Sequence, residues 1–229
     1  MTKRLLRWLD ERLGTNKFLR TATAKVFPDH WSFLFGEIAM YCFVILVLTG
    51  VYLSFFFSPS PKEVTYHGSY APLRGVRMTE AYNSTVRLSF DVRAGLVFRQ
   101  VHHWAALVFV GAIVVHLCRI YFTGAFRKPR ELNWVIGVTL LLLVIVNGFF
   151  GYSLPDDLLS GTGLRIMYSV ALAIPVVGTW FAFLLFGGEF PAEDITSRMF
   201  VLHILVLPAL IATVMGVHLA VVWRQKHTQ

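Results

Sequence analysis

Four apolar runs, each long enough to cross a lipid bilayer, do most to limit how this chain of 229 residues can fold. They lie at about 32–57, 95–122, 133–154 and 199–223. A helix needs about 20 apolar residues to cross the hydrocarbon core, and only helices and closed barrels satisfy their backbone hydrogen bonds there. The sequence therefore predicts an all-α membrane protein with four transmembrane helices in a single domain over residues 1–229. The composition agrees, since 56% of the residues are hydrophobic and only 15% are charged.

A fifth apolar stretch, at about 164–186, complicates the count of spans. It contains Pro175 and Gly178 near its middle and ends in Gly187 and Gly188. Proline and glycine interrupt helices, so this stretch is expected to form two short surface helices between the third and fourth spans. At the other end of the chain, residues 3–13 place their leucines largely on one helical face, which predicts an amphipathic helix at the membrane interface.

The distribution of charge predicts the orientation in the membrane. Lysine and arginine concentrate in the N-terminal segment, the second connection and the tail, whereas the third connection is acidic. Cytoplasmic segments of membrane proteins are rich in lysine and arginine, so four spans place every basic segment and both termini on the cytoplasmic side. A fifth span would export the basic tail. Topology thus accounts for the net charge of +8, and nucleic-acid binding is not expected.

Four histidines lie inside the second and fourth apolar runs. His102 and His116 are separated by 14 residues, and His203 and His218 by 15. On a helix these steps return to within about 40° and 60° of the same face, and they separate the members of a pair by roughly 21–23 Å. Because one span lies between them, the second and fourth helices run parallel. His102 and His203 are therefore expected near the outer face, and His116 and His218 near the inner face.

Paired imidazoles at two depths are typical of a protein that holds two haems. Two imidazole nitrogens on opposite sides of a porphyrin leave the iron without an open site, so such a haem carries electrons. The chain has two cysteines and no CxxC or CxxCH sequence, which argues against covalent haem, a disulfide framework and a cysteine-ligated metal site. The neighbouring His103 falls about 140° from the His116 stripe and is expected to face another helix or a quinone region.

The alternative is that these histidines only donate hydrogen bonds between helices, in a haem-free membrane scaffold. Matched depth favours haem, because ionisable groups inside a span are costly and usually functional. Glycines add a second signal, since Gly36 and Gly50 in the first span, and Gly137 and Gly151 in the third, are each 14 residues apart. Glycine lets a flat macrocycle approach a helix backbone, although small residues also serve ordinary helix packing.

Two arginines lie beyond the histidines of the second span, toward the nearer membrane surface. Arg99 precedes His102 by three residues, and Arg119 follows His116 by three. Each is expected to pair with the propionates of its haem, and the alternative for each is that it reaches the lipid headgroups.

These residues stand in motifs that resemble the cytochrome b family of quinol–cytochrome c and quinol–plastocyanin reductases. The resemblance covers nearly the whole chain, from VFPDHWSFLFGEIA to WRQKHTQ, and its motifs are RQVHHW, VHLCRIYFTGAFRKPRELNW, GYSLP, LHILVLP and GVHLAVVW. It is closest to the N-terminal, dihaem four-helix portion of the actinobacterial menaquinol-oxidising cytochrome b. The resemblance therefore implies a protein of the bacterial cytoplasmic membrane.

The family implies a low-potential haem b between His102 and His203 and a higher-potential one between His116 and His218. It implies quinol oxidation at the outer face, a Rieske iron–sulfur protein and a cytochrome c-type subunit as partners, and a homodimeric complex. Electrons would pass through both haems to a quinone near the inner face, and the resemblance implies that this quinone is menaquinone. The outer quinol pocket matches Phe149, Tyr152 and Gly163, whereas Arg224 and Lys226 are candidates for the inner site by location only.

The sequence departs from the family pattern in three respects. The Pro-Glu-Trp-Tyr motif of the family's second portion is absent, so another polypeptide or further sequence is expected to supply that portion, and the isolated chain is not expected to be catalytically complete. Leu34 occupies the position of the cysteine that holds the extra haem of the b6f cytochrome, so no covalent third haem is expected. The 15-residue step in the fourth span resembles the b6f and actinobacterial forms. A dihaem membrane anchor of a dehydrogenase or hydrogenase is the alternative function.

Overall fold

The computed structural model describes Asp10 and residues 30–188, 190, 192 and 194–225. The amphipathic helix expected over residues 3–13 falls outside the described residues apart from Asp10, and Lys226 also lies outside them. Four long apolar helices dominate the described part of the chain, as the sequence predicts. They are α3 (Leu34–Ser54), α5 (Gly95–Phe122), α6 (Glu131–Ser153) and a continuous helix formed by α9 (Ile195–Val201), η3 (Leu202–Val206) and α10 (Leu207–Gln225).

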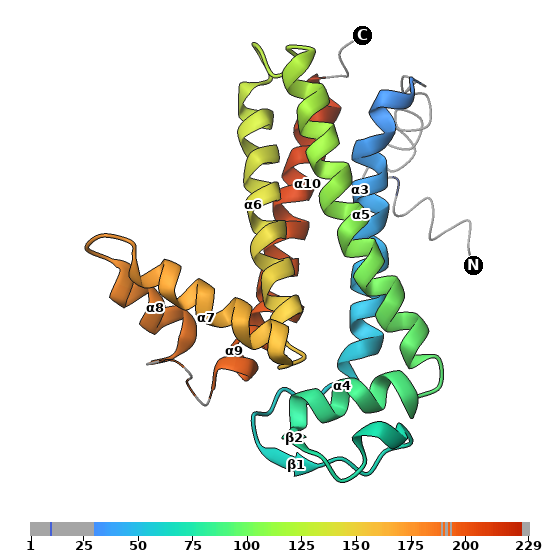
Figure 1. Ribbon diagram of the computed structural model, residues 1–229. Coiled ribbons are helices and arrows are strands. Elements are labelled where there is room, and N and C mark those ends of the chain that lie inside the picture. Colours follow the sequence, from blue (N-terminus) through green and yellow to red (C-terminus); the bar gives the residue numbers. More distant parts are fainter. Residues whose placement is uncertain (1–9, 11–29, 189, 191, 193, 226–229) are drawn as a thin grey trace.

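The spans pack as two pairs (Figure 1). Helix α3, which follows the short helix η1 (Trp31–Phe33), lies along α5, and α10 lies along α6. A cluster of buried side chains joins the pairs at mid-height, and Phe43 and Phe109 meet there with ring centroids 6.1 Å apart. Many large apolar side chains on the outside of the bundle are exposed, for example Leu48 and Leu142. A lipid environment accommodates such a surface, because lipid tails are as apolar as leucine.

The fifth apolar stretch forms two short helices, as predicted. Helix α7 (Leu158–Leu172) starts earlier than the stretch, at the cap residue Asp157, whose carboxylate accepts the Ser160 backbone N–H at 2.8 Å. Helix α8 (Gly178–Phe186) follows a tight turn and ends at Gly187 with a φ of 82°. Figure 1 shows α7 and α8 projecting sideways from one end of the bundle. They are thus placed at the end of the membrane spans that holds His102 and His203.

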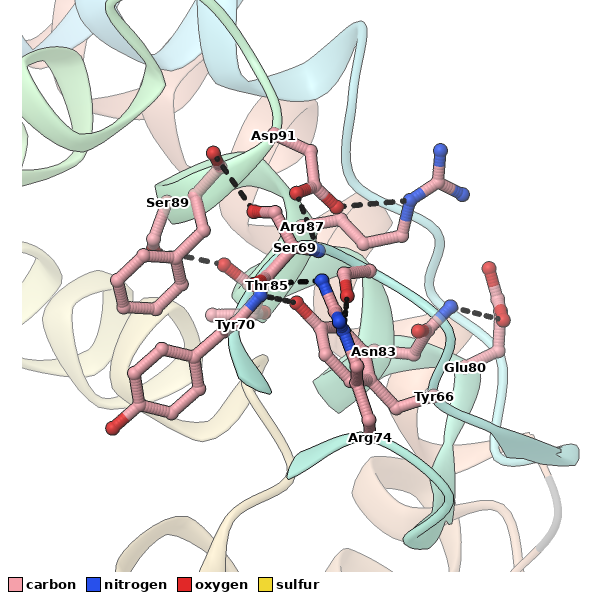
Figure 2. Close-up of polar contacts among 12 residues, drawn as sticks. Tyr66, Ser69, Tyr70, Arg74, Glu80, Asn83, Thr85, Arg87, Ser89 and Asp91 are labelled. Atoms are coloured by element: carbon pink, nitrogen blue, oxygen red, sulfur yellow. Dashed lines mark hydrogen bonds and ion pairs between the residues drawn. The ribbon is translucent and has the colours of Figure 1, made fainter. Parts of the chain in front are cut away.

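The first connection, predicted only as an external loop, has a fold of its own. It contains the antiparallel strands β1 (Glu63–Thr65) and β2 (Arg77–Thr79), the short helix η2 (Ala71–Leu73) and the helix α4 (Glu80–Phe90). Tyr66 is fully buried beneath them and packs with Met78 and Val86. Its hydroxyl accepts the Tyr70 backbone N–H at 3.1 Å, within the polar network of Figure 2. This structured connection lies across the end of the bundle where α3 ends and α5 begins (Figure 1).

Candidate functional site

Two of the four histidines, at the level that the sequence predicts to be the outer one, face each other from different helix pairs. His102 comes from α5 and His203 from η3, and their ring centroids lie 6.1 Å apart at an interplanar angle of 73°. Two metal–imidazole bonds of about 2 Å each would take up about 4 Å of this separation, and the two ring radii account for the remainder. The spacing therefore suits one metal ion bound by both rings.

The second ring nitrogen of each outer histidine has a hydrogen-bond partner. His102 Nδ1 lies 2.8 Å from Thr49 Oγ1 on α3, and His203 Nδ1 donates to the carbonyl oxygen of Asn147 on α6 at 2.9 Å. Histidines that bind metals usually use their other N–H in this way, which fixes the ring orientation and the tautomer. The Nε2 atoms of both rings are thereby left for a shared ligand.

The inner histidines lie at the other end of the same helices. His116 and His218 are close enough to interact electrostatically. Their Nδ1 atoms are buried without a well-formed hydrogen bond, although that of His218 lies beside the backbone of Asn133. The structure therefore brings together the residues that the sequence pairs by depth, and the two levels differ in how the rings are held.

The glycines of α3 lie directly against the histidines of α5. A Cβ placed on Gly36 would lie 3.2 Å from His116 Cε1, and one on Gly50 would lie 3.3 Å from His102 Cε1. Both distances are tighter than ordinary van der Waals contact. The matched spacing of these glycines thus allows each imidazole to lie against the α3 backbone. The sequence predicts that these glycines make room for the macrocycle, whereas in the structure the imidazole rings lie against them.

The glycines of α6 have the same relationship to the histidines of the fourth span. A Cβ on Gly137 would lie 3.7 Å from His218 Cε1, which is an ordinary contact, whereas a Cβ on Gly151 would overlap the His203 ring. Gly151 is therefore the most restrictive of the four positions. Gly36 and Gly137 thus lie at the level of His116 and His218, and Gly50 and Gly151 lie at the level of His102 and His203.

A local change in helix geometry accommodates the 15-residue step between His203 and His218. Residues Leu202–Val206 form a π-helical turn, and the Leu207 N–H donates to the Leu202 carbonyl, five residues earlier. A π turn takes one more residue than an α turn and often occurs at functional sites. Pro208 follows directly. It has no N–H to donate, and its ring clashes with the carbonyl of the residue four positions earlier, so a regular α-helical hydrogen bond cannot form there. The turn absorbs the extra residue, so His203 and His218 remain on one face.

Basic side chains gather around the inner level. The Arg119 guanidinium lies over the Phe33 ring, 4.0 Å from its centroid, and the buried Nε atoms of Arg119 and Arg130 have no hydrogen-bond partner among the described residues. Gln225 donates from Nε2 to the Pro129 carbonyl at 2.8 Å and thereby ties the end of α10 to this connection. Such buried donors need an acceptor, and the carboxylates of a haem would supply one.

The donor sets fit haem better than an ion held by protein alone. No group of three or more histidine, cysteine or acidic side chains that could hold a metal occurs in the described part of the chain. Each level offers two imidazoles, whereas a structural zinc site takes four protein ligands. A porphyrin brings its own equatorial nitrogens and leaves only the two axial positions to the protein. Three features suit that group: glycines lie against the histidine rings, the outer imidazoles are oriented by hydrogen bonds, and the buried Nε atoms of Arg119 and Arg130 have no hydrogen-bond partner in the described part of the chain.

The remaining predicted residues are placed as follows. Arg99 Nη1 donates to Ser89 Oγ on α4 at 3.1 Å, so this arginine already has a protein partner. Phe149 and Gly163 meet between α6 and α7, since a Cβ on Gly163 would lie 3.9 Å from Phe149 Cε2. Tyr152 is 51% exposed on the same helix as Phe149.

Two further predicted positions are exposed. Arg224 lies in the last turn of α10 and is exposed to the surroundings. His103 is also exposed, and its ring centroid lies 5.8 Å from that of Trp104.

Sequence reasoning missed the residues that orient the outer histidines. Thr49 precedes Gly50 directly, and Asn147 precedes Gly151 by four residues, as Asn133 precedes Gly137. Asparagine inside a transmembrane helix is a usable signal, because polar groups there need partners. The sequence predicts Arg130 only as part of the basic second connection, whereas the structure buries its Nε at the inner level.

Comparisons with known proteins show which family the chain is similar to. The family model described as cytochrome b(N-terminal)/b6/petB matches residues 107–229, more than half of the chain. The chain is 59% identical over 222 residues to the cytochrome bc1 complex cytochrome b subunit of Mycobacterium leprae, covering 96% of this chain and 40% of that relative. It is 55% identical over 227 residues to the subunit of the same description from Streptomyces coelicolor, covering 99% of this chain and 42% of that relative.

A solved structure shows the same fold. A chain of the structure described as hyperthermophilic respiratory Complex III superposes with a TM-score of 0.76 at 24% identity, covering 95% of this chain and 54% of that chain. The chain thus spans about two fifths of the length of the curated relatives, with shares of 40% and 42%.

Proposed function

This chain belongs to the cytochrome b family, and from that membership we propose that it forms the dihaem electron-transfer part of a quinol–cytochrome c reductase. The observation that supports the proposal best is the pairing of His102 with His203, whose ring centroids lie 6.1 Å apart. A second histidine pair lies at the other level of the same two helices. Membership implies binding of haem b, and the residues present fit two haems, one at each level.

In this proposal His102 and His203 hold the outer haem through Nε2, and His116 and His218 hold the inner one. Haem with two imidazole ligands supplies reversible one-electron transfer without an open coordination site. Thr49 and the Asn147 carbonyl fix the outer rings, and the glycines give all four rings room. Between the levels, roughly 21 Å apart along a helix, Phe43 and Phe109 pack in an apolar layer that excludes water.

The protein's own charges assist at the inner level. Arg119 and Arg130, which are partly exposed, each have a buried Nε–H that would pair with a haem propionate. Arg99 is held by Ser89 at the outer level and remains the proposed propionate partner there. Phe149, Gly163 and Tyr152, beside α7, are the proposed contribution of this chain to an outer quinol pocket.

The complete activity involves more than this chain. We propose that the complete complex oxidises menaquinol at the outer face. Its other parts are a Rieske iron–sulfur protein, a cytochrome c-type subunit and the portion of cytochrome b that the relatives have beyond the region matched by this chain. A homodimeric complex in the bacterial cytoplasmic membrane, with both termini cytoplasmic, completes the proposal. The chain itself is a multi-pass membrane protein.

The test is a reduced-minus-oxidised optical spectrum with pyridine-haem quantification on the full chain and on the variants His102→Ala and His116→Ala. The expected result is about two noncovalent b haems per chain, with a different haem lost in each variant. Absence of haem, or a single haem that neither substitution affects, would overturn the proposal and favour a haem-free scaffold. Replacement of the exposed His103 by alanine is the matched control and should leave both haems in place.

A further inference from the structure

The outer and inner histidine pairs differ in what their second ring nitrogens contact. At the outer level both Nδ1 atoms have hydrogen-bond partners, Thr49 Oγ1 at 2.8 Å and the Asn147 carbonyl at 2.9 Å. At the inner level neither Nδ1 atom has a well-formed hydrogen bond, although that of His218 lies beside the backbone of Asn133 and that of His116 has no partner among the described residues. The four helices therefore hold two histidine pairs that differ in the hydrogen bonds of their Nδ1 atoms.

The direction of the Thr49 hydrogen bond follows from its other contact. Thr49 donates its hydroxyl hydrogen to the Ile45 carbonyl, 2.7 Å away and four residues earlier in α3. The hydroxyl has one hydrogen, so a lone pair of Oγ1 faces His102, and His102 Nδ1 must carry the proton. Its Nε2 is then unprotonated and can bind iron. Thr49 is only 6% exposed, so water does not compete for this hydrogen bond.

The corresponding position at the inner level lacks a hydroxyl. Fourteen residues before Thr49 and Gly50 stand Phe35 and Gly36, so the glycine is repeated but the threonine is replaced by phenylalanine. Gly36 gives the His116 ring the same close approach to α3. The inner ring thus has the space that the outer ring has, without the acceptor.

We propose that Thr49 is a positioning residue that fixes the Nδ1–H form of His102 and lowers the midpoint potential of the outer haem relative to the inner one. A hydrogen bond from Nδ1–H to an acceptor makes the imidazole a stronger electron donor through Nε2. A stronger donor stabilises the oxidised iron more than the reduced iron, and hydrogen bonding around the ligands is a known determinant of haem potential. This inference rests on the proposed function, because it needs haem at the outer level.

The test is a potentiometric measurement of both haems, followed by their optical spectra, in the intact membrane complex. Thr49→Val keeps the shape of the side chain and removes the hydroxyl acceptor while the Leu46 backbone beside His102 stays in place, and Thr49→Ser keeps the hydroxyl. We expect Thr49→Val to favour reduction of the outer haem by roughly tenfold, which is about 59 mV for a one-electron couple, and to leave the inner haem unchanged. Thr49→Ser should remain close to the unmodified protein.

Thr213→Val is the matched control, because the Thr213 hydroxyl also donates to a carbonyl four residues earlier, at 2.8 Å, but lies exposed on α10. It should change neither potential. If Thr49→Val loses the outer haem while Thr49→Ser keeps it, the positioning role is supported. Unchanged potentials in Thr49→Val, or equal shifts of both haems, would overturn the inference. An unmodified protein without haem would instead refute the proposed function, so the two failures are distinguishable.

Discussion

Leu207 donates its backbone N–H to the carbonyl of Leu202, five residues earlier, and this π turn keeps His203 aligned with His218 across a 15-residue step. The equivalent histidines of α5 are 14 residues apart on an uninterrupted α-helix. Two different local geometries therefore place four imidazoles at two common levels.

This relationship predicts that the fourth span tolerates a deletion that the second does not. Removal of Leu205, which is 63% exposed within the π turn, leaves a 14-residue step that an α-helix can accommodate, so both haems should be retained. Removal of Val108 from α5, where no π turn can absorb the change, should rotate one histidine by about 100° and release a haem. Haem per chain is the measurement, and equal loss in the two deletions would contradict the explanation.

The glycines opposite the histidines predict a graded series of alanine substitutions. Gly151→Ala should release the outer haem, because the new Cβ overlaps the His203 ring, whereas Gly137→Ala should be tolerated at a contact of 3.7 Å with His218. Gly148→Ala on the same helix is the control, since nothing lies within 4 Å of its position. Haem content by difference spectrum decides the order, and an outer haem that persists in Gly151→Ala would show that the ring can shift.

Arg119, whose Nε is buried near the inner level, predicts a change in the midpoint potential of the inner haem alone. Arg119→Gln removes a positive charge that favours the reduced state, so the midpoint potential of the inner haem should fall while that of the outer haem stays the same. Arg99→Gln is the comparison, because Arg99 lies at the outer end and donates to Ser89. A fall in the inner potential in both variants would indicate a general disturbance of the bundle.

The structured outer connection predicts a dependence on pH. Hydrogen bonds from Ser69, together with the nearby Arg87, hold the pKa of the Asp91 carboxyl below its usual range. A lowered pKa means that the charged carboxylate stabilises the folded connection above the ordinary pKa of aspartate, and that this stabilisation disappears as the pH falls through the lowered value.

Asp91→Asn should therefore increase hydrogen exchange over residues 66–76 at neutral pH, and the difference from the unmodified protein should vanish in acid. The control is Glu63→Gln, which removes only the exposed ion pair with Arg77 across the two strands. Exchange that is the same in Asp91→Asn and the unmodified protein at neutral pH would show that the carboxylate does not hold this connection.

Much of the site could be predicted from the sequence because its signals are local. The apolar runs fix the four spans, since a span is set by its own length and hydropathy. The 14- and 15-residue steps fix which histidines share a helix face, since that depends only on the helical repeat. The sequence also predicts that Gly36 lies level with His116 and Gly151 with His203, because successive spans alternate in direction.

The rest depended on contacts between distant parts of the chain. The partners of the outer histidines, Thr49 and Asn147, lie 53 and 56 residues away from them, so no local pattern could reveal which nitrogen of each ring remains free. The fold of residues 58–94 was likewise missed, because its short strands become stable only over the buried Tyr66.

The sequence by itself thus determined where the helices cross the membrane and at which levels the imidazoles lie, because helix periodicity and hydropathy act along the chain. Only the tertiary structure decided how each ring is oriented and how the two levels differ. Those properties arise from hydrogen bonds and close approaches between helices, which exist only once the two helix pairs are packed together.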